Sequence, residues 1–313
     1  RVEVESSTAG NIVAVTGISD LEIGDTLTVE GESPIEFVKI SEPTISMTFS
    51  VNDSPFAGRE GKFVTSRQLR SRLMKEIETN VSMKIEETDS TDSFIVKGRG
   101  ELHISVLIET MRREGYEFQV SKPQVLYKRD ENGQKLEPIE EVIIDVDAAY
   151  IGSIMDKLGQ RKGELKNMTE SRGGYSRLEF EIPARGLIGY RQEFLTDTRG
   201  EGIINTEFKD FEPYKGDIPK RQMGSLIAFE NATSTAYGLF QAQDRGNLFI
   251  GPGVEVYEGM IVGENPKGLD IEVNVGKEKQ KTNMRAAGSD ENLRLVPPIT
   301  MSLEEALEFI EDD

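Results

Sequence analysis

The sequence predicts an α+β protein of several domains, in which two modules with six elements each lie between two β-rich ends. Three observations predict this class. The 313 residues exceed the length of one typical domain. The periodicity of apolar residues gives the order strand, helix, strand, strand, helix, strand twice, within residues 43–123 and 124–212. From residue 213 onward the helical period is replaced by short β segments between glycine, proline and asparagine turns.

Residues 1–42 are predicted to form the C-terminal part of a β-barrel. Strand-like stretches at 10–16 and 25–29 flank a turn at Gly24. The chain starts at Arg1 directly in this pattern and finishes inside a predicted helix, so we expect it to be a piece of a longer protein.

Residues 43–123 hold the first six-element module. Its strands are expected at 44–51, 82–88, 93–97 and 116–121, and its helices at 65–79 and 101–114. Thr65 and Gln68 have the spacing of a capping box at the start of the first helix. Two glycines permit a tight turn before the second helix, and Gly115 supplies its C-terminal stop.

Residues 124–212 repeat this order. Strands are expected at 140–147, 163–169, 175–182 and 203–210, and helices at 151–159 and 186–197. Both modules therefore have the βαββαβ order of a ferredoxin-like fold.

Residues 213–313 are predicted to form a mainly-β domain. Its strands are expected at 224–230, 235–241, 260–264, 269–275 and 293–296. A final helix starts at Ser302, where Glu305 completes a capping box.

The formal net charge of −19 argues at first sight against a nucleic-acid partner, because phosphate binding depends on lysine and arginine. The acidic residues are unevenly distributed, however. Residues 1–42 carry nine acids against two bases, and residues 302–313 carry six acids and no base. The acidic charge is concentrated at the two ends, which weakens the objection.

Several chemistries are excluded by the sequence. Gly61-Lys62 is followed by Phe63 where a P-loop needs serine or threonine, so no phosphate cradle is encoded. One histidine and no cysteine exclude a His/Cys metal site, and no cofactor is expected. The sequence has no apolar run long enough to span a bilayer, so we expect a cytoplasmic location and no membrane partner.

No catalytic residue is predicted. His103, the single histidine, has the pattern of a partly buried residue at a helix start that is hydrogen-bonded to backbone. Asp145 and Asp147 share one face of a strand and could mimic a catalytic acid pair, but charges on a solvated sheet face are far commoner.

Two groups of cations are candidates for contacts with RNA phosphates. Arg161, Lys162 and Lys166 cluster where a helix meets a strand, and pairing with the helix dipole is the alternative explanation. The second group lies in a loop between β segments, where a solvated hairpin tip is the alternative. Its members are Lys277, Lys279, Lys281 and Arg285.

Several motifs in a fixed order resemble translational GTPases of the EF-G-like group, and among these the BipA/TypA family. The motif Gly98-Arg-Gly-Glu-Leu-His103 is similar to the third domain of that group. Fewer than twenty residues separate Ser121 from Ile139, which leaves no room for the large tRNA-mimicking domain of EF-G. The motifs similar to BipA/TypA are Gln160-Arg-Lys-Gly163, Pro183-Ala-Arg-Gly-Leu-Ile-Gly189, Gln243-Asp-Arg-Gly246, Val256-Tyr-Glu-Gly259, Thr282-Asn-Met-Arg285 and Val296-Pro-Pro298.

The resemblance implies the ribosome-binding half of a GTPase that assists large-subunit assembly and translation and supports growth in cold and stress. Both cation groups would then contact large-subunit rRNA, and the loop group also A-site tRNA. GTP and Mg²⁺ would belong to a GTPase domain missing from this chain, so the chain itself is not expected to be an enzyme. A monomer without a DNA partner is expected. A protein-interaction module without RNA contact is the alternative.

Overall fold

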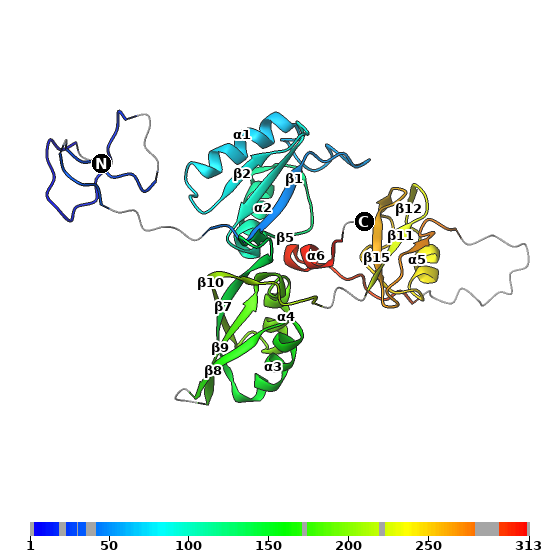
Figure 1. Ribbon diagram of the computed structural model, residues 1–313. Helices are drawn as coiled ribbons and strands as arrows, with labels where there is room; N and C mark the ends of the chain where they lie inside the picture. Colours follow the sequence, from blue (N-terminus) through cyan, green and yellow to red (C-terminus); the bar gives the residue numbers. More distant parts are fainter. Residues whose placement is uncertain are drawn as a thin grey trace, which may run out of the picture.

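The computed structural model describes residues 3–18, 23–29, 31–35, 42–170, 174–218, 223–278 and 294–311. Helices and strands form two mixed modules and a β-rich C-terminal domain, and a last short helix lies between them (Figure 1). This arrangement confirms the predicted α+β class with two ferredoxin-like modules. The domain boundaries proposed from the sequence stay predictions.

The described residues between 3 and 35 contain no strand, so the strands expected at 10–16 and 25–29 are not formed. Apolar side chains in this part are exposed, Ile12 completely and Val29 by 67%. A strand needs a neighbour that pairs with its backbone N–H and C=O groups, and no described segment pairs with these residues. Strand-like residues alone were therefore an insufficient signal here.

The first module is an antiparallel sheet with two helices packed on one face. Its elements are β1 (Ile45–Ser50), α1 (Ser66–Ile77), β2 (Lys84–Glu87), β3 (Ser93–Gly98), α2 (Glu101–Glu114), β4 (Gln119–Val120) and β5 (Gln124–Val125). The strand order is β2-β3-β1-β4, with β5 also pairing with β1. Every second residue of β1 is buried, and Phe49 and Met47 pack in one core with Leu73 of α1 and Met111 of α2.

Local signals set the ends of both helices in this module. The Thr65 side chain accepts a hydrogen bond from the Gln68 N–H, and the Gln68 side chain accepts one from the Thr65 N–H, so the predicted capping box is present. Gly115 ends α2 with a φ of +94°, a left-handed conformation that glycine adopts without strain.

One carboxylate holds the loop that precedes α1. Glu117 accepts hydrogen bonds from three backbone N–H groups of residues 58–61, at 2.6 to 2.9 Å. These bonds, led by that of Gly58, lower the pKa of Glu117 to about 2. The loop is thereby fixed where the Phe56 ring packs edge-on against Tyr257 of the C-terminal domain, with 5.0 Å between ring centroids.

The second module repeats the topology with longer strands. Its elements are β6 (Lys128–Arg129), β7 (Lys135–Asp147), α3 (Ile151–Gln160), β8 (Glu164–Glu170), β9 (Tyr175–Pro183), α4 (Tyr190–Asp197) and β10 (Ile203–Pro213), with short 3₁₀ turns η1 (Ala148–Tyr150) and η2 (Ala184–Gly186). The strand order is β10-β7-β9-β8, and β6 pairs with β7. The helix expected at 186–197 begins only at Tyr190, because η2 precedes it and Gly189 has a φ of +72°.

The segments that enter and leave the second module are fastened at one buried ion pair. Glu137 is fully buried, and the Arg185 guanidinium donates to both of its carboxylate oxygens. Glu137 also accepts the Lys215 N–H at 2.7 Å, and Arg185 also donates to the Gly216 carbonyl. The Tyr214 ring lies 4.4 Å from the same guanidinium. This cluster ties the chain after β10 to the start of β7.

The C-terminal domain contains a four-stranded sheet, a two-stranded ribbon and one helix. Its elements are β11 (Gly224–Ala228), β12 (Ala232–Thr233), α5 (Ala236–Ala242), β13 (Asn247–Leu248), β14 (Glu255–Val256), β15 (Ile261–Asn265) and β16 (Ile271–Val273). The order of the larger sheet is β13-β15-β11-β16, with β11 and β16 parallel, and β12 pairs with β14.

Two strands expected in this domain are wrong. The segment 235–241 is almost entirely the helix α5, because the Thr235 side chain caps the Gly238 N–H at 2.9 Å. A Cβ at Gly238 would approach the Val275 carbonyl oxygen to 2.2 Å, so close packing with the neighbouring backbone decides this element. The described part of the strand expected at 293–296 is irregular.

Candidate functional site

The turn between α3 and β8, together with the start of β8, carries three of the predicted RNA-contacting cations. The chain reverses at Lys162, whose φ is +66°, and a Cβ at the following Gly163 would lie 2.9 Å from the Leu158 carbonyl oxygen. The turn therefore has a fixed shape. It directs Arg161 toward α4 and Lys166 toward the face of the sheet that the helices leave open.

Arg161 points inward and is engaged within the protein. Its guanidinium donates to the carbonyls of Gly186 and Ile188, at 3.2 and 3.0 Å, and to Glu193 at 2.9 Å. The side chain is only 21% exposed. These bonds hold the turn that leads into α4, so the structure gives Arg161 a positioning role beside the predicted contact with RNA.

Replacing Arg161 with alanine is expected to lower the free energy of unfolding of the second module by about 2 kcal/mol, because three charge-assisted hydrogen bonds are lost. Urea denaturation followed by circular dichroism measures this change. Lys162→Ala is the control in the same turn, and we expect it to change stability by less than about 0.5 kcal/mol. Equal stability of the two variants would show that the bonds of Arg161 do not support the fold.

Lys166 lies on the open face of the second sheet, in ion pairs with the exposed Glu164 and the less exposed Glu181. Its Nζ atom is 3.0 Å from carboxylate oxygens of both Glu164 and Glu181, and its side chain is 44% exposed. The pair with Glu164 is exposed on both sides and contributes roughly 0–1 kcal/mol, so Lys166 can exchange it for a phosphate at little cost. Lys162 is half-buried and has no ion pair among the described residues.

The second cation group is described only at its first member. Lys277 is exposed and follows β16, and its backbone carbonyl accepts a hydrogen bond from the Thr235 hydroxyl at 2.6 Å. The base of the loop is thus tied to the N-cap of α5. Lys279, Lys281 and Arg285 lie outside the described residues, so their part in RNA binding stays a prediction.

The residues considered for catalysis have structural partners. The Asp145 carboxylate binds Arg177 through two hydrogen bonds of 2.8 Å, and Asp147 caps the 3₁₀ turn that follows it. His103 accepts a hydrogen bond on Nδ1 from the Arg99 N–H at 3.3 Å, as expected for a residue at a helix start. Burial and then Arg99 lower the pKa of His103, which favours its neutral form. These contacts favour the structural interpretation of all three residues.

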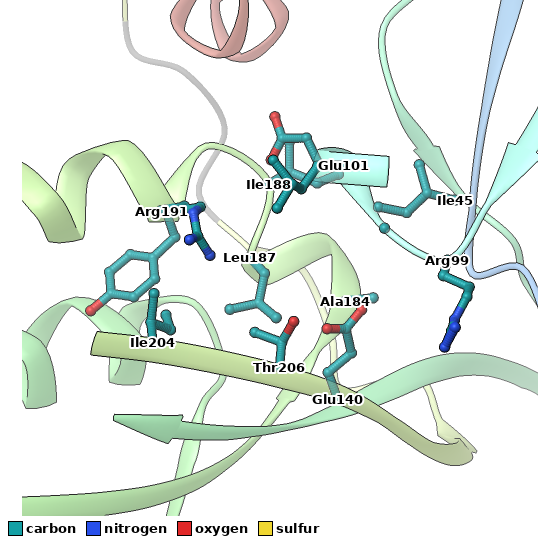
Figure 2. Close-up of a pocket in the computed structure, with 13 residues that line it drawn as sticks. Ile45, Arg99, Glu101, Glu140, Ala184, Leu187, Ile188, Arg191, Ile204 and Thr206 are labelled. Carbon is teal, nitrogen blue, oxygen red and sulfur yellow. The ribbon is translucent and has the colours of Figure 1, made fainter. Parts of the chain in front are cut away.

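A cavity of about 120 Å³ lies between the two modules and is lined by residues of both (Figure 2). Its walls include Arg99 and Glu101 of the first module and Glu140 and Arg191 of the second. Figure 2 shows the Glu140 side chain rising from its strand toward the cavity, with Thr206 beside it. Glu140 is 6% exposed, and burial raises its pKa to about 7, although a hydrogen bond with Thr206 acts in the opposite sense.

The cavity was missed in the sequence, although one signal was present. Glu140 shares the parity of Val142, Ile144 and Val146 in β7, so the two-residue period of a strand places it on the apolar face. Glu101, across the cavity, accepts the Gly189 N–H at 3.0 Å and thereby caps α4 from the other module. Burial raises the pKa of Glu101 as well.

A metal or membrane site finds no support in the part of the chain that the structure describes. No group of three or more histidine, aspartate or glutamate side chains there is arranged to hold a metal ion. None of the described helices has the length and apolar character required to cross a bilayer.

Two family models match the second half of the chain. The model for the elongation factor G C-terminus matches residues 134–222, which include the strands β7 to β10. The model for the TypA/BipA C-terminal domain matches residues 223–313, which include the whole β-rich domain and the last helix. Proteins called "Large ribosomal subunit assembly factor BipA" align with all of this chain, at 52% identity in Synechocystis sp., 49% in Bacillus subtilis (strain 168) and 50% in Escherichia coli (strain K12).

The chain belongs to the BipA/TypA family. It spans about half the length of the curated relatives it matches, namely 52%, 51% and 52% of the Synechocystis, Bacillus and Escherichia proteins. A crystal structure of a Thermus thermophilus protein covers 59% of this chain, and this chain covers 44% of that one, at 15% identity and a TM-score of 0.37, which is too low to bear on the fold.

The candidate cations of this BipA/TypA chain divide between the two matched regions. The group at the α3–β8 turn lies within the elongation factor G C-terminus match, and the loop group that starts at Lys277 lies within the TypA/BipA C-terminal domain match. The two groups therefore lie in different matched regions, and each can be changed in a separate variant.

Proposed function

We propose that this chain docks on the large ribosomal subunit during its assembly. The observation that carries the proposal is the alignment of the whole chain, at about 50% identity, with proteins named large ribosomal subunit assembly factors. The elongation factor G C-terminus match supports a ribosomal partner for the second module. Roles in translation and in adaptation to cold and stress belong to the same proposal.

The proposed contacts with large-subunit rRNA come from the two groups of cations predicted from the sequence. Lys162 and Lys166 offer positive charge beside the open sheet of the second module, and Arg161 holds the turn that carries them. Lys277, Lys279, Lys281 and Arg285 form the second contact, which reaches rRNA and A-site tRNA. Lysine on a loop reads the phosphate backbone and the shape of A-form RNA rather than its sequence.

GTP hydrolysis with Mg²⁺ is proposed to reside outside these 313 residues, because the chain contains no P-loop motif. The chain itself is proposed to act as a cytoplasmic monomer without a catalytic site, a cofactor, a membrane contact or a DNA partner. Its contribution would then be affinity and orientation on the ribosome.

Reversing the charge of Lys162 and Lys166 is expected to weaken binding to purified large subunits several-fold. The slope of log affinity against log salt should become less steep by roughly 2, because two phosphate contacts are lost. Cosedimentation across a potassium chloride series measures both quantities. The variant is Lys162→Glu/Lys166→Glu, and a Lys277→Glu/Lys279→Glu/Lys281→Glu variant tests the loop group in the same way.

The matched control is Lys75→Glu/Lys84→Glu, which reverses two exposed lysines of the first module that have no ion pair among the described residues. The control and the Lys162→Glu/Lys166→Glu variant change the net charge by the same amount, so a non-specific charge effect would weaken these two equally. Affinity and salt slope equal to those of the wild-type chain in the first two variants would refute the proposed contacts.

A protein-interaction module is the second candidate, and the edge strand β8 favours it. All seven residues of β8 are exposed, and the strand pairs on one side only, with β9. Such an edge can accept a strand from a partner protein. This candidate predicts that the affinity for the ribosome does not change with salt concentration or in the lysine variants. It also predicts that binding is lost when Met168, at this edge, is replaced with proline.

A further inference from the structure

The last helix, α6 (Leu303–Phe309), contacts all three folded parts of the chain (Figure 1). Leu307 is 2% exposed and packs in the core cluster of the first module, together with Ala184 of the second. Phe309 lies edge-on against Phe249 of the C-terminal domain, with ring centroids 5.3 Å apart at 90°. One short helix therefore fills the junction of three units.

Polar contacts at the end of α6 extend this junction. Glu311 forms an ion pair with Lys122, which lies where the first module passes into the second. Glu308 lies 3.7 Å from the Arg161 guanidinium. A Cβ added at Gly189 would meet the Glu308 side chain at 2.2 Å, so the helix approaches the second module as closely as a glycine permits.

The free energy that holds α6 in its docked position is small. Seven residues are too few for a helix that is stable in isolation, so α6 depends on its contacts. Its acidic side chains also meet an acidic surface. Glu304 and Glu308 both act on Glu101 by charge repulsion, and Arg161 is the cation that opposes it there. The helix is thus held by a few apolar contacts and by the ion pairs of Glu308 and Glu311, and the repulsion at Glu101 acts against them.

The other attachment of the C-terminal domain to the first module is weak. Among the described residues it includes the Phe56–Tyr257 ring contact and an ion pair between Arg59 and Glu255, whose side chains are 52% and 64% exposed. An ion pair of this exposure contributes roughly 0–1 kcal/mol. Loss of α6 from the junction would leave the C-terminal domain with little to fix its orientation.

We propose that α6 is a releasable strap. Docked, it holds the two modules and the C-terminal domain in a single arrangement. Released, it lets the C-terminal domain reorient while the sheets of all three units persist. The proposal rests on the contacts of α6 and is independent of whether the chain binds the ribosome.

The absence of cysteine makes the strap directly testable. Cysteines introduced at Lys84 in the first module and Lys267 in the C-terminal domain, both exposed, carry a pair of spin labels. Double electron–electron resonance then gives the distribution of distances between them. We compare the labelled 313-residue chain with a Leu307→Asp variant and with a chain that ends after Met301.

The intact chain is expected to give one narrow distance distribution, and both strap variants a distribution at least twice as broad. Leu269→Asp is the matched control, because Leu269 is a 65% exposed leucine of the C-terminal domain and should leave the distribution narrow. Circular dichroism shows whether the cores persist, and if Leu307→Asp unfolds the first module the shortened chain decides. A narrow, unshifted distribution in a folded chain without α6 would overturn the proposal.

Discussion

Replacing Arg185 with methionine is expected to lower the free energy of unfolding of the second module by about 3–5 kcal/mol. The reason is that Glu137, which is fully buried, would lose the cation that pairs with it. The Lys215 N–H is the other group that donates to this carboxylate, and one backbone bond does not compensate a buried charge. Urea denaturation monitored by circular dichroism measures the loss.

Two controls separate this effect from the loss of an arginine in general. Arg177→Met removes the ion-pair partner of Asp145. Because the Arg177 side chain is 50% exposed, this substitution should lower the free energy of unfolding by less than about 1 kcal/mol. The double variant Glu137→Leu/Arg185→Met removes both charges and should regain most of the lost stability. A single Arg185→Met variant as stable as Arg177→Met would contradict the assignment of a buried ion pair.

Replacing Glu140 with glutamine is expected to stabilise the chain at pH 8 by up to about 3 kcal/mol and to change little near pH 5. The pKa of Glu140 is raised from 4.5 to about 7 by burial, so the folded state favours the protonated form. The protonated Glu140 carboxyl therefore contributes fully to stability below the pKa that it has in the unfolded chain, and this contribution is lost as the pH rises toward 7. Glutamine keeps the neutral shape and removes the titration.

The measurement is the difference in unfolding free energy between Glu140→Gln and the wild-type chain, at pH 5 and at pH 8. Taking the difference at each pH cancels the titration of other groups, including Glu101 across the cavity. Glu141→Gln is the control for the chemical change itself, because this neighbour is exposed on the other face of β7. An equal effect of Glu140→Gln at both pH values would show that the carboxyl does not titrate differently in the folded chain.

The two βαββαβ modules could be predicted from the sequence because their signals are local. Apolar periodicity, the capping box at Thr65 and the left-handed glycine at Gly115 all act within a few residues of the element they define. The final helix was predicted for the same reason, since Ser302 and Glu305 cap it.

The remaining features depend on contacts between distant residues. Segment 235–241 is predicted as a strand, but the Thr235 cap and the packing of Gly238 against the backbone at Val275 make it a helix. Residues 10–16 look like a strand but have no partner among the described segments. Glu137 pairs with Arg185, which is 48 positions away, and Glu101 caps α4 from 88 positions away. Contacts over such distances produce no periodic pattern in the sequence.

The candidate site was predictable in its residue types more than in its geometry. Clustered cations in an acidic chain were visible in the sequence, and Lys166 is indeed exposed. Arg161 points inward toward two backbone carbonyls because the chain turns at Lys162. The backbone of Lys162 is left-handed, and a lysine at this position does not predict that conformation.

The proposed docking on rRNA can be tested by hydroxyl-radical footprinting of rRNA in purified large subunits, with and without this chain bound. We expect localised protection of the rRNA backbone, part of which disappears with Lys162→Glu/Lys166→Glu and another part with the Lys277, Lys279 and Lys281 charge reversals. Binding of the chain without any protected rRNA, or protection that is identical in all variants, would contradict it.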